Sequence, residues 1–393
     1  MNPLVILGSG LAGYGLLREF RKRDPNTPVT LITADDGRVY SKPNLSNALA
    51  QGRAPEQLAT DSAEQAAVKF NARILTQTRV SAIDPAAKQV QTDAGPVEYD
   101  RLVLALGADP FAHGLSGSGA ADVLSVNDLV DYSRFRAALA GKRHVAILGG
   151  GLIGCEFAND LAATDHAVSV VHLGPWPLER LIPQAVGDAL THALEKHGVA
   201  WHFGRSAKQV ERSAAGYRLM LDDGSQIEAD LVLSAIGLRP RTQLAQAAGC
   251  TTKRGIVVNR HLQTSLPGIY AIGDCAEVEG HVLPFVQPLL IQVRALAGIL
   301  AGEMAGEMGG EKASAVAAVS YPAMPVMVKT PAYPLAVLPP ALNAEGEWRM
   351  ETSPVGLRAL HLSPNGTLNG FAVGGGETGK RAELAKQVAA LLP

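Results

Sequence analysis

Short apolar runs followed by glycine turns set the hydrophobic pattern in the first part of this 393-residue chain. The first run, residues 3–7, leads through Gly8-Ser9-Gly10 into a segment, 11–22, with the pattern of a helix. Asp24-Pro25-Asn26 breaks that helix, and the next apolar run covers 29–32. The pattern predicts a strand, a turn, a helix and a second strand at the start of the chain.

A second unit of the same kind is predicted at residues 145–171, with a strand at 145–148, a helix at 152–163 and a strand at 167–171. Both units carry G-x-G-x-x-G between strand and helix, first as Gly8, Gly10 and Gly13 and then as Gly149, Gly151 and Gly154. The first glycine permits the tight bend, the second lets the backbone approach a pyrophosphate, and the third lets helix and strand pack closely. Free N–H groups at the helix start then face the phosphates. One such turn is weak evidence, but two complete units predict that the chain binds two dinucleotides.

The pattern changes after residue 280. A helix is expected to follow 283–287 and to run to about residue 304, and the Ala-, Gly- and Glu-rich run 301–319 is interpreted as its end plus a linker. Residues 321–337 and 346–373 alternate like antiparallel strands, and 378–392 has the pattern of a closing helix. A small α+β domain is therefore expected at the end of the chain.

Composition narrows the classes of partner. The formal net charge of −2 argues against a nucleic-acid or anionic-membrane partner. Gln292, Arg294 and Glu303 interrupt the most apolar long stretch, 289–304, so no membrane span is expected. The ten histidines are dispersed, and no metal site is predicted. No charged leader precedes the first strand, and a cytoplasmic, reducing location is expected from the scattered, odd-numbered cysteines, Cys155, Cys250 and Cys275.

The segment 264–277, TSLPGIYAIGDCAE, resembles the second flavin-binding motif of FAD-dependent pyridine-nucleotide reductases. An apolar strand at 269–272 ends there at Gly273-Asp274, and two shorter strand–glycine motifs of that family end at Gly107 and Gly237. The resemblance implies an α/β fold with two Rossmann-like dinucleotide-binding domains in the glutathione-reductase arrangement, followed by the small α+β C-terminal domain. The domains it implies are a discontinuous FAD-binding domain at 1–110 and 234–315, an NAD(P)H-binding domain at 111–233 and a C-terminal interface domain at 316–393.

Relatives of this kind often pass electrons through a cysteine, and this chain has none where they carry one. The stretch RVYSKPNLS, residues 38–46, holds serine, lysine and asparagine instead. Cys155 lies behind the second glycine turn and is interpreted as a packing residue. A dithiol or sulfenate mechanism is therefore excluded. What remains is a flavin that accepts hydride and passes electrons outward to a one-electron partner or to oxygen, without a catalytic side chain.

The segments ITADDGRVYSKPNLS, GCEFANDL, GLRPRT, IYAIGDCAEV and MPVMVKTPAYP are most similar to those of rubredoxin–NAD(P) reductases, over essentially the whole chain. This resemblance implies electron transfer from NADH, through non-covalently bound FAD, to a small iron protein such as rubredoxin, in a chain like that feeding alkane hydroxylation. A ferredoxin reductase of a dioxygenase or P450 system is the adjacent alternative. An NADH-responsive regulatory flavoprotein of the apoptosis-inducing-factor type is the alternative from another class, although no targeting leader or extra loop supports it.

The resemblance also implies which residues meet the flavin cofactor. The set is Ser9, Gly10, Leu11, Ala12, Thr33, Ala34, Asp35, Lys42, Val80, Glu156, Asp274, Val286 and Lys329. Asp274 is expected to accept a hydrogen bond from the ribityl chain. The turn 33–35 is expected to hold the adenosine ribose. Lys329, which follows the apolar run 325–328, is expected near flavin N1 and O2, where a cation favours the anionic reduced ring.

Six members of this set also have a simpler interpretation. Asp35 fits a plain turn, Asp274 fits a helix N-cap, and Lys42 fits a solvated loop lysine. Val80 fits strand core at the end of the extended run 73–79. An acid in the first turn of its helix, as Glu156 is expected to be, complements the helix dipole. Lys329 fits a charge on the edge of a sheet.

The nicotinamide nucleotide is assigned to Gly149, Gly151 and Gly154. The strand after this turn ends at Val171-His172-Leu173, with neither an acid for a ribose hydroxyl nor an arginine for a 2′-phosphate. The absent arginine favours NADH over NADPH, although the position of Arg180, a few residues further on, weighs against that preference.

Overall fold

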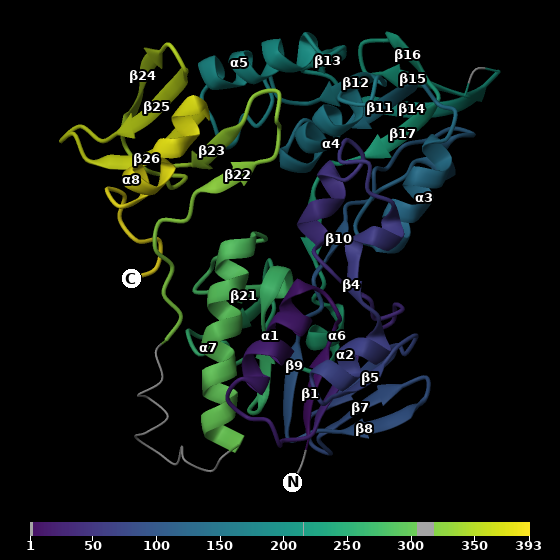
Figure 1. The fold of residues 1–393 in the computed structure, drawn as a ribbon, viewed down its shortest axis with the longest axis vertical. Coiled ribbons are helices and arrows are strands. Elements are labelled where there is room, and N and C mark those ends of the chain that lie inside the picture. The colour runs from purple at the N-terminus through teal and green to yellow at the C-terminus, as the bar shows by residue number, and fades with distance from the viewer. Residues whose placement is uncertain (1–2, 215, 305–317) are drawn as a thin grey trace.

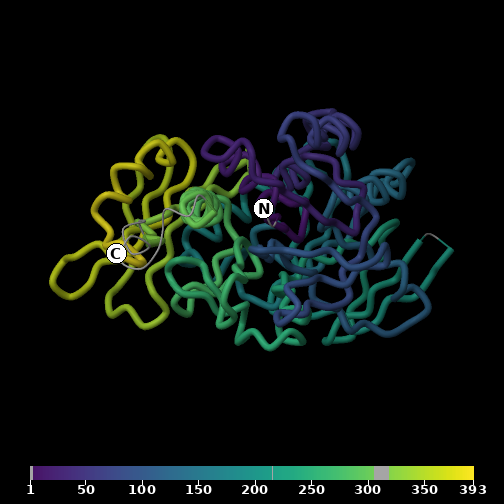
Figure 2. The backbone as a smooth tube through the Cα atoms, turned by 90° about the horizontal axis from the view of Figure 1, so that it is seen from below, coloured from purple at the N-terminus to yellow at the C-terminus, as the bar shows by residue number. Residues whose placement is uncertain are grey.

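The computed structural model describes residues 3–214, 216–304 and 318–393 of the chain. Its fold is α/β, with two parallel sheets followed in the chain by an antiparallel sheet (Figure 1). In Figure 1 the first sheet lies at the bottom, the second at the upper right and the antiparallel sheet, in yellow, at the upper left. Seen from below in Figure 2, the antiparallel sheet forms one end of the molecule. The predicted fold class is confirmed.

The first sheet is parallel and has the strand order β20-β9-β1-β2-β5. Its strands are β1 (Leu4–Leu7), β2 (Val29–Ile32), β5 (Arg73–Leu75), β9 (Arg101–Leu104) and β20 (Ile269–Ala271). Every residue of β1 and β2 is buried, because helices cover the sheet, and their sequences are correspondingly apolar. Helices α1 (Leu11–Arg21) and α7 (Val286–Met304) pack side by side against it. Since β9 and β20 are neighbours, the chain leaves this sheet and later returns to it.

The second sheet repeats this arrangement with the order β13-β12-β11-β17. Its strands are β11 (His144–Leu148), β12 (Ala167–His172), β13 (Val199–Phe203) and β17 (Leu231–Ser234), with helices α3 (Leu129–Leu139), α4 (Leu152–Ala162) and α5 (Gln184–Glu195). An antiparallel sheet of β14 (Ala207–Ser213), β15 (Gly216–Leu221) and β16 (Gln226–Ala229) packs beside it. The chain enters and leaves this unit through the antiparallel pair β10 (Ala108–Pro110) and β18 (Leu238–Pro240).

Shorter elements complete the two parallel units. They are β3 (Val39–Tyr40), η1 (Lys42–Asn47), η2 (Pro55–Leu58), β4 (Ala59–Asp61), α2 (Ala63–Lys69), β6 (Val80–Asp84), β7 (Gln89–Thr92), β8 (Gly95–Glu98), η3 (Ala120–Asp122), α6 (Gln243–Ala247), β19 (Ile256–Val258), η4 (Gly273–Cys275) and β21 (Ala276–Val278). Val80 was expected to end an extended run, but β5 stops at Leu75 and Val80 opens the hairpin of β6 and β7. The break has a local cause, since Gln77 adopts a φ of +50°, which ends a strand.

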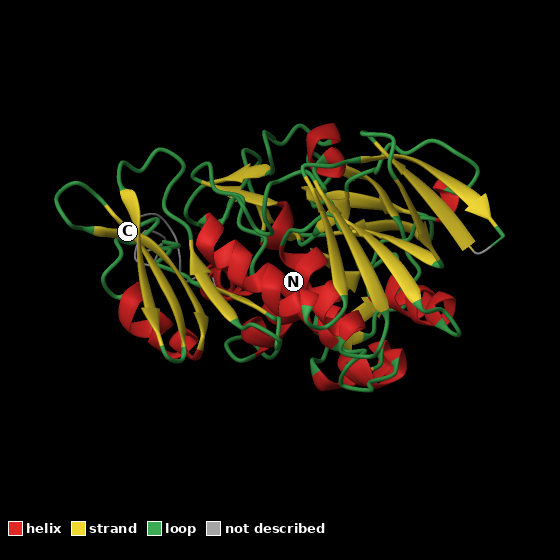
Figure 3. Cartoon of the chain, turned by 90° about the horizontal axis from the view of Figure 1, so that it is seen from above, coloured by secondary structure: helices red, strands yellow, loops and turns green. Residues whose placement is uncertain are grey.

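The C-terminal unit is built on a five-stranded antiparallel sheet with the order β22-β23-β26-β25-β24. The strands are β22 (Val326–Val328), β23 (Leu335–Leu338), β24 (Glu347–Ser353), β25 (Gly356–Leu362) and β26 (Leu368–Gly375), followed by η6 (Gly376–Lys380) and α8 (Arg381–Ala385). Figure 3 shows helices on one side of this sheet. The predicted strands are confirmed, but the predicted helix over 378–392 is too long. The backbones of Leu392 and Tyr321 exchange two hydrogen bonds, which requires extended chain there.

Helix α7 confirms the helix expected up to residue 304, and its buried face packs on α1. Among the described residues, no helix is both long and apolar enough to cross a membrane. The domain limits predicted from the sequence remain a proposal. The limit between residues 315 and 316, and most of the predicted linker 301–319, lie outside the described residues.

Candidate functional site

The first glycine turn leaves room for a ligand at one position only. Gly8 has a φ of +115°, and a Cβ added there would lie 2.3 Å from the carbonyl oxygen of Ala105. A Cβ on Gly13 would lie 1.9 Å from the carbonyl oxygen of Gly8. Gly10, just before α1, is exposed, and a Cβ there would meet nothing within 4 Å. The fold therefore explains the first and third glycines, whereas the second fits a backbone that a pyrophosphate approaches.

The second turn has the same geometry. Gly149 has a φ of +103° and lies against Ala235, whose carbonyl oxygen would be 2.6 Å from an added Cβ. A Cβ on Gly154 would lie 1.9 Å from the oxygen of Gly149, and one on Gly151 would again meet nothing within 4 Å. Both turns thus fit a dinucleotide at the start of a helix, α1 in one and α4 in the other.

Ser9, Thr33 and Asp35 come together beside the first turn. The hydroxyls of Ser9 and Thr33 donate to the Asp35 carboxylate at 2.9 and 2.7 Å. Asp35 also accepts from the N–H of Gly37 at 2.9 Å, which is the plain turn interaction, while Ala34 is exposed. The plain turn foreseen for Asp35 is therefore present, and the assignment of the adenosine ribose to residues 33–35 stays a prediction.

Four further predicted residues lie at the starts of α1, α7 and β6. Leu11 and Ala12 form the first turn of α1, directly behind Gly10. Val286 begins α7 and is exposed. Val80 is half-buried at the start of β6, and the nearby Thr78 N–H donates to the carbonyl oxygen of Thr33 at 2.9 Å. The hairpin is thereby held next to the polar cluster.

Lys42 and Asp274 form a pair of desolvated charges. Burial lowers the pKa of Lys42 and raises that of Asp274, and the charge of each opposes the shift of the other. The Lys42 ammonium donates to the side-chain oxygen of Asn127 at 2.5 Å, and Asn127 donates to the carbonyl of Ala108 at 2.9 Å. Lys42 is therefore tethered rather than a solvated loop lysine. Asp274 lies inside η4, whose N-cap is Ile272, so the interpretation as an N-cap is wrong.

Glu156 and Lys329 are brought together from different units. The Lys329 ammonium lies 2.9 Å from Glu156 Oε2, and its backbone N–H donates to Oε1 at 3.0 Å. Ser46 donates to Oε2 at 2.5 Å and accepts from the Lys329 ammonium at 2.9 Å. The carbonyl of Pro43 also accepts from Lys329. Since Leu152 begins α4, Glu156 lies in the second turn rather than the first, and Lys329 is an ion-paired residue rather than an edge charge.

The same face of α4 carries two further polar residues that were not predicted. Asn159 accepts at 3.0 Å from the N–H of Ala332, and Asp160 accepts from the N–H groups of Leu49 and Ala50 at 3.0 and 2.9 Å. Positions i, i+3 and i+4 of a helix share one face. Three buried polar residues at this spacing, in a helix that is otherwise apolar, are a signal that the sequence contained. They bind α4 to the segment after η1 and to the C-terminal unit.

Asp160 predicts a pH dependence of stability. Its burial, opposed by the two backbone hydrogen bonds, raises its pKa from 3.8 to about 6. Between these values the folded state binds a proton that the unfolded state has lost, so stability falls as pH rises. The change is about 3 kcal/mol over that range and levels off above pH ~6. Asp160→Asn should remove this slope, measured by urea unfolding at several pH values.

The control for that experiment is Asp188→Asn, because Asp188 is exposed on α5. The slope should persist in this variant. An Asp160→Asn protein with the same pH dependence as the parent would contradict the assignment.

The three cysteines are buried, which confirms Cys155 as a packing residue. Its thiol donates to the carbonyl of Gly150 at 3.3 Å, and burial raises its pKa far above the ordinary value. Burial likewise raises the pKa of Cys275 to about 11. These thiols are held in the protonated form, which is unreactive toward disulfides.

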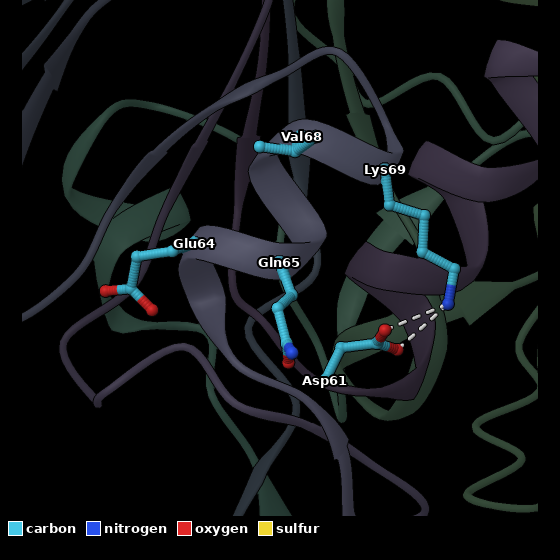
Figure 4. A pocket seen from close by; sticks show the side chains of 5 residues that line it. All are labelled: Asp61, Glu64, Gln65, Val68 and Lys69. Atoms are coloured by element: carbon cyan, nitrogen blue, oxygen red, sulfur yellow. Dashed lines mark hydrogen bonds and ion pairs between the residues drawn. The ribbon is translucent and has the colours of Figure 1, made fainter.

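A separate surface hollow lies on α2 (Figure 4). It contains none of the predicted site residues. Two of its charged side chains pair with each other, the Lys69 ammonium lying 3.0 Å from the Asp61 carboxylate, while Glu64 points away from them. The side chains that line it are Asp61, Glu64, Gln65, Val68 and Lys69. It has no feature of a cofactor site.

Two family models match the chain, one over the two units with parallel sheets and one over the C-terminal unit. Residues 2–295 match the family model of the pyridine nucleotide-disulphide oxidoreductases. Residues 318–388 match the model of the rubredoxin binding C-terminal domain. The first match covers the units of both glycine turns, and the second covers the unit that contains Lys329.

Similar proteins cover 95% or more of the chain. A rubredoxin-NAD(+) reductase of Alcanivorax borkumensis is 46% identical over 394 residues, which are 100% of both chains. A nitric oxide reductase FlRd-NAD(+) reductase of Vibrio vulnificus is 35% identical over 95% of this chain and 94% of its own. Among solved structures, a ferredoxin reductase of Rhodopseudomonas palustris has a TM-score of 0.86 at 25% identity, over 99% of this chain and 96% of that one.

Proposed function

The chain belongs to the pyridine nucleotide-disulphide oxidoreductase family and, within it, to the rubredoxin-NAD(+) reductases, and we propose from this that it reduces rubredoxin with electrons from NADH by way of FAD. The single observation that carries the proposal is the match of residues 318–388 to a rubredoxin-binding domain. The ion pair of Lys329 with Glu156 attaches that domain to α4, the helix that follows the second glycine turn. A docked carrier would therefore lie on the unit that is joined to both dinucleotide units.

FAD would be held non-covalently at the first glycine turn. Gly10 and the start of α1 leave space for the pyrophosphate, and the Ser9, Thr33 and Asp35 cluster lies beside it. Lys42 and Asp274, two desolvated charges, suit the diphosphate and the ribityl hydroxyls. Leu11, Ala12, Ala34, Val80, Glu156, Val286 and Lys329 complete the proposed set. Bound FAD supplies the conversion of a hydride, a two-electron donor, into single electrons.

NADH would bind at the second turn, formed by Gly149, Gly151 and Gly154. The described side chains include no reactive thiol, so this chain's residues bind, orient and shield rather than relay electrons. Alkane hydroxylation as the downstream use, and a cytoplasmic location, remain parts of the proposal.

Two alternatives have specific support. The likeness to a ferredoxin reductase keeps a [2Fe–2S] ferredoxin as a candidate acceptor. The relative from Vibrio vulnificus favours a different acceptor, since its name refers to nitric oxide reductase FlRd. A regulatory flavoprotein of the apoptosis-inducing-factor type has no such support.

The test is NADH-driven reduction of purified rubredoxin and of a [2Fe–2S] ferredoxin at equal concentrations, with oxygen consumption as the background. We expect much faster turnover with rubredoxin, and a marked loss of rate as salt rises, because charge steers such encounters. Faster reduction of the ferredoxin would support the first alternative. Electron flow to oxygen alone would contradict both carrier functions.

A further inference from the structure

The carboxyl end of β12 is where a dinucleotide fold of this kind places the ribose of the adenosine half. An acid usually stands at this strand end and accepts hydrogen bonds from the ribose hydroxyls. In this chain the position is His172, the last residue of β12. The position at the end of the strand therefore carries no acid, as predicted from the sequence.

His172 connects the glycine turn to a carboxylate. The N–H of Gly150, the residue between the first two turn glycines, donates to Nδ1 of His172 at 3.0 Å. With Nδ1 as acceptor, the proton of a neutral ring is on Nε2. Nε2 lies 2.7 Å from Oε2 of Glu179 and donates to it. Glu179, seven residues further along the chain, is thus placed at the strand end.

The loop that carries Glu179 is fixed against the same turn. The N–H of Leu178 donates to the carbonyl oxygen of Gly150 at 3.0 Å, and Leu178 is buried. Its φ of +59° lies in the left-handed region, which is unfavourable for a residue with a branched side chain and persists only where the surroundings enforce it. Gly174 makes room for the carboxylate, since an added Cβ would lie 2.6 Å from Cδ of Glu179.

The rest of the strand end suits an adenosine. Leu173 follows His172 and is 74% exposed, an apolar surface of the kind that adenine covers. The Glu179 side chain is 23% exposed, and only its Oε2 is occupied by His172. Arg180 is 91% exposed at 3.6 Å from Oε1, so its charge lies next to an anion and not in an open phosphate site.

We propose that Glu179 supplies the carboxylate that accepts the adenosine ribose hydroxyls of NADH, with His172 as its positioning residue and Leu173 under the adenine. The inference rests on the proposed function only in taking NADH as the electron donor. It also gives a reason for coenzyme choice. The 2′-phosphate of NADPH would lie beside the Glu179 carboxylate, and like charges at that distance repel.

The experiment measures binding of ADP-ribose and of 2′-phospho-ADP-ribose by calorimetry, which is independent of turnover. Glu179→Gln should weaken ADP-ribose binding about tenfold or more, the usual loss for a hydrogen bond to a charged group. Binding of the 2′-phosphorylated probe should stay the same or tighten. Asp188→Asn is the control, because Asp188 is an exposed acid on α5 that has no part in the proposed site, and it should leave ADP-ribose binding unchanged.

Equal weakening of both probes by Glu179→Gln, or no change in either, would overturn the inference. If that variant does not fold, Leu173→Ser is the second test, since the side chain is exposed. Both probes should then bind more weakly, and unchanged binding would contradict the adenosine site. A parent protein that binds neither probe would instead contradict NADH as donor, and so the proposed function itself.

Discussion

Gly10→Val is expected to remove FAD from the protein while leaving its fold intact. Gly10 has an extended backbone, with φ −68° and ψ −174°, which any residue adopts. A Cβ added there would meet nothing within 4 Å, so the surrounding protein does not require glycine. It would occupy the space through which a pyrophosphate approaches. Overpacking a close contact costs roughly 1–3 kcal/mol, or about a 5- to 150-fold loss of affinity.

Gly13→Ala should behave differently, because its Cβ would lie 1.9 Å from the carbonyl oxygen of Gly8. Helix α1 and β1 would have to separate, so this variant should lose both flavin and thermal stability. The measurements are the flavin-to-protein ratio after gel filtration and the melting temperature of the flavin-free protein. Gly379→Ala is the matched control, since Gly379 is exposed and also has free space around it. A Gly10→Val protein that keeps a full complement of flavin would contradict the assignment of this turn.

The parts of the fold that were predicted from the sequence are those set by local pattern. Both strand–glycine–helix units, α7 and the C-terminal strands follow from hydrophobic periodicity and turn residues, which act over a few positions. The errors have two causes. A distant contact opposes the predicted helix over 378–392, since Leu392 pairs with Tyr321, whereas a left-handed backbone at Gln77, which the apolar pattern does not report, separates Val80 from β5.

The distance between residues along the chain also explains which parts of the candidate site could be predicted. The glycines of both turns were found because their spacing is local. Ser46 and Glu156 are 110 residues apart, and Glu156 and Lys329 are 173 apart, so their contact depends on how three units pack. The role proposed for Glu179 could not be read from the sequence for a related reason. No acid was predicted at the end of β12, but a loop with a left-handed residue brings the Glu179 carboxylate to His172 from further along the chain.

Glu156→Ala is expected to loosen the C-terminal unit and to slow rubredoxin reduction. The variant leaves the backbone N–H of Lys329 without its acceptor, removes the only carboxylate that pairs with the Lys329 ammonium among the described residues, and removes the partner of Ser46. Removing one member of a buried ion pair costs about 3–5 kcal/mol. Lys329 is 30% exposed, which places the cost near the lower end, about 3 kcal/mol, or roughly a 100-fold change in an opening equilibrium.

Hydrogen exchange of the amides in β22 measures that opening directly, since this strand immediately precedes Lys329. Exchange there should accelerate about 100-fold in Glu156→Ala. Glu156→Ala combined with Lys329→Met should recover part of the loss, because no unpaired charge remains. The control is Glu377→Ala. Glu377 is also buried, but it pairs with Arg358 at 3.1 Å inside the C-terminal unit, so this variant should destabilise that unit without affecting its attachment to α4.

The functional consequence follows from where the carrier docks. If rubredoxin binds the C-terminal unit, a unit that detaches from α4 presents the carrier at a variable distance from the bound flavin. NADH-driven rubredoxin reduction by Glu156→Ala should then fall at least about tenfold, with reduction of a small artificial acceptor such as ferricyanide less affected. Equal losses with both acceptors would indicate damage to the flavin site rather than to docking. Unchanged exchange in β22 together with unchanged rubredoxin turnover would show that the pair of Glu156 and Lys329 does not hold the C-terminal unit in place.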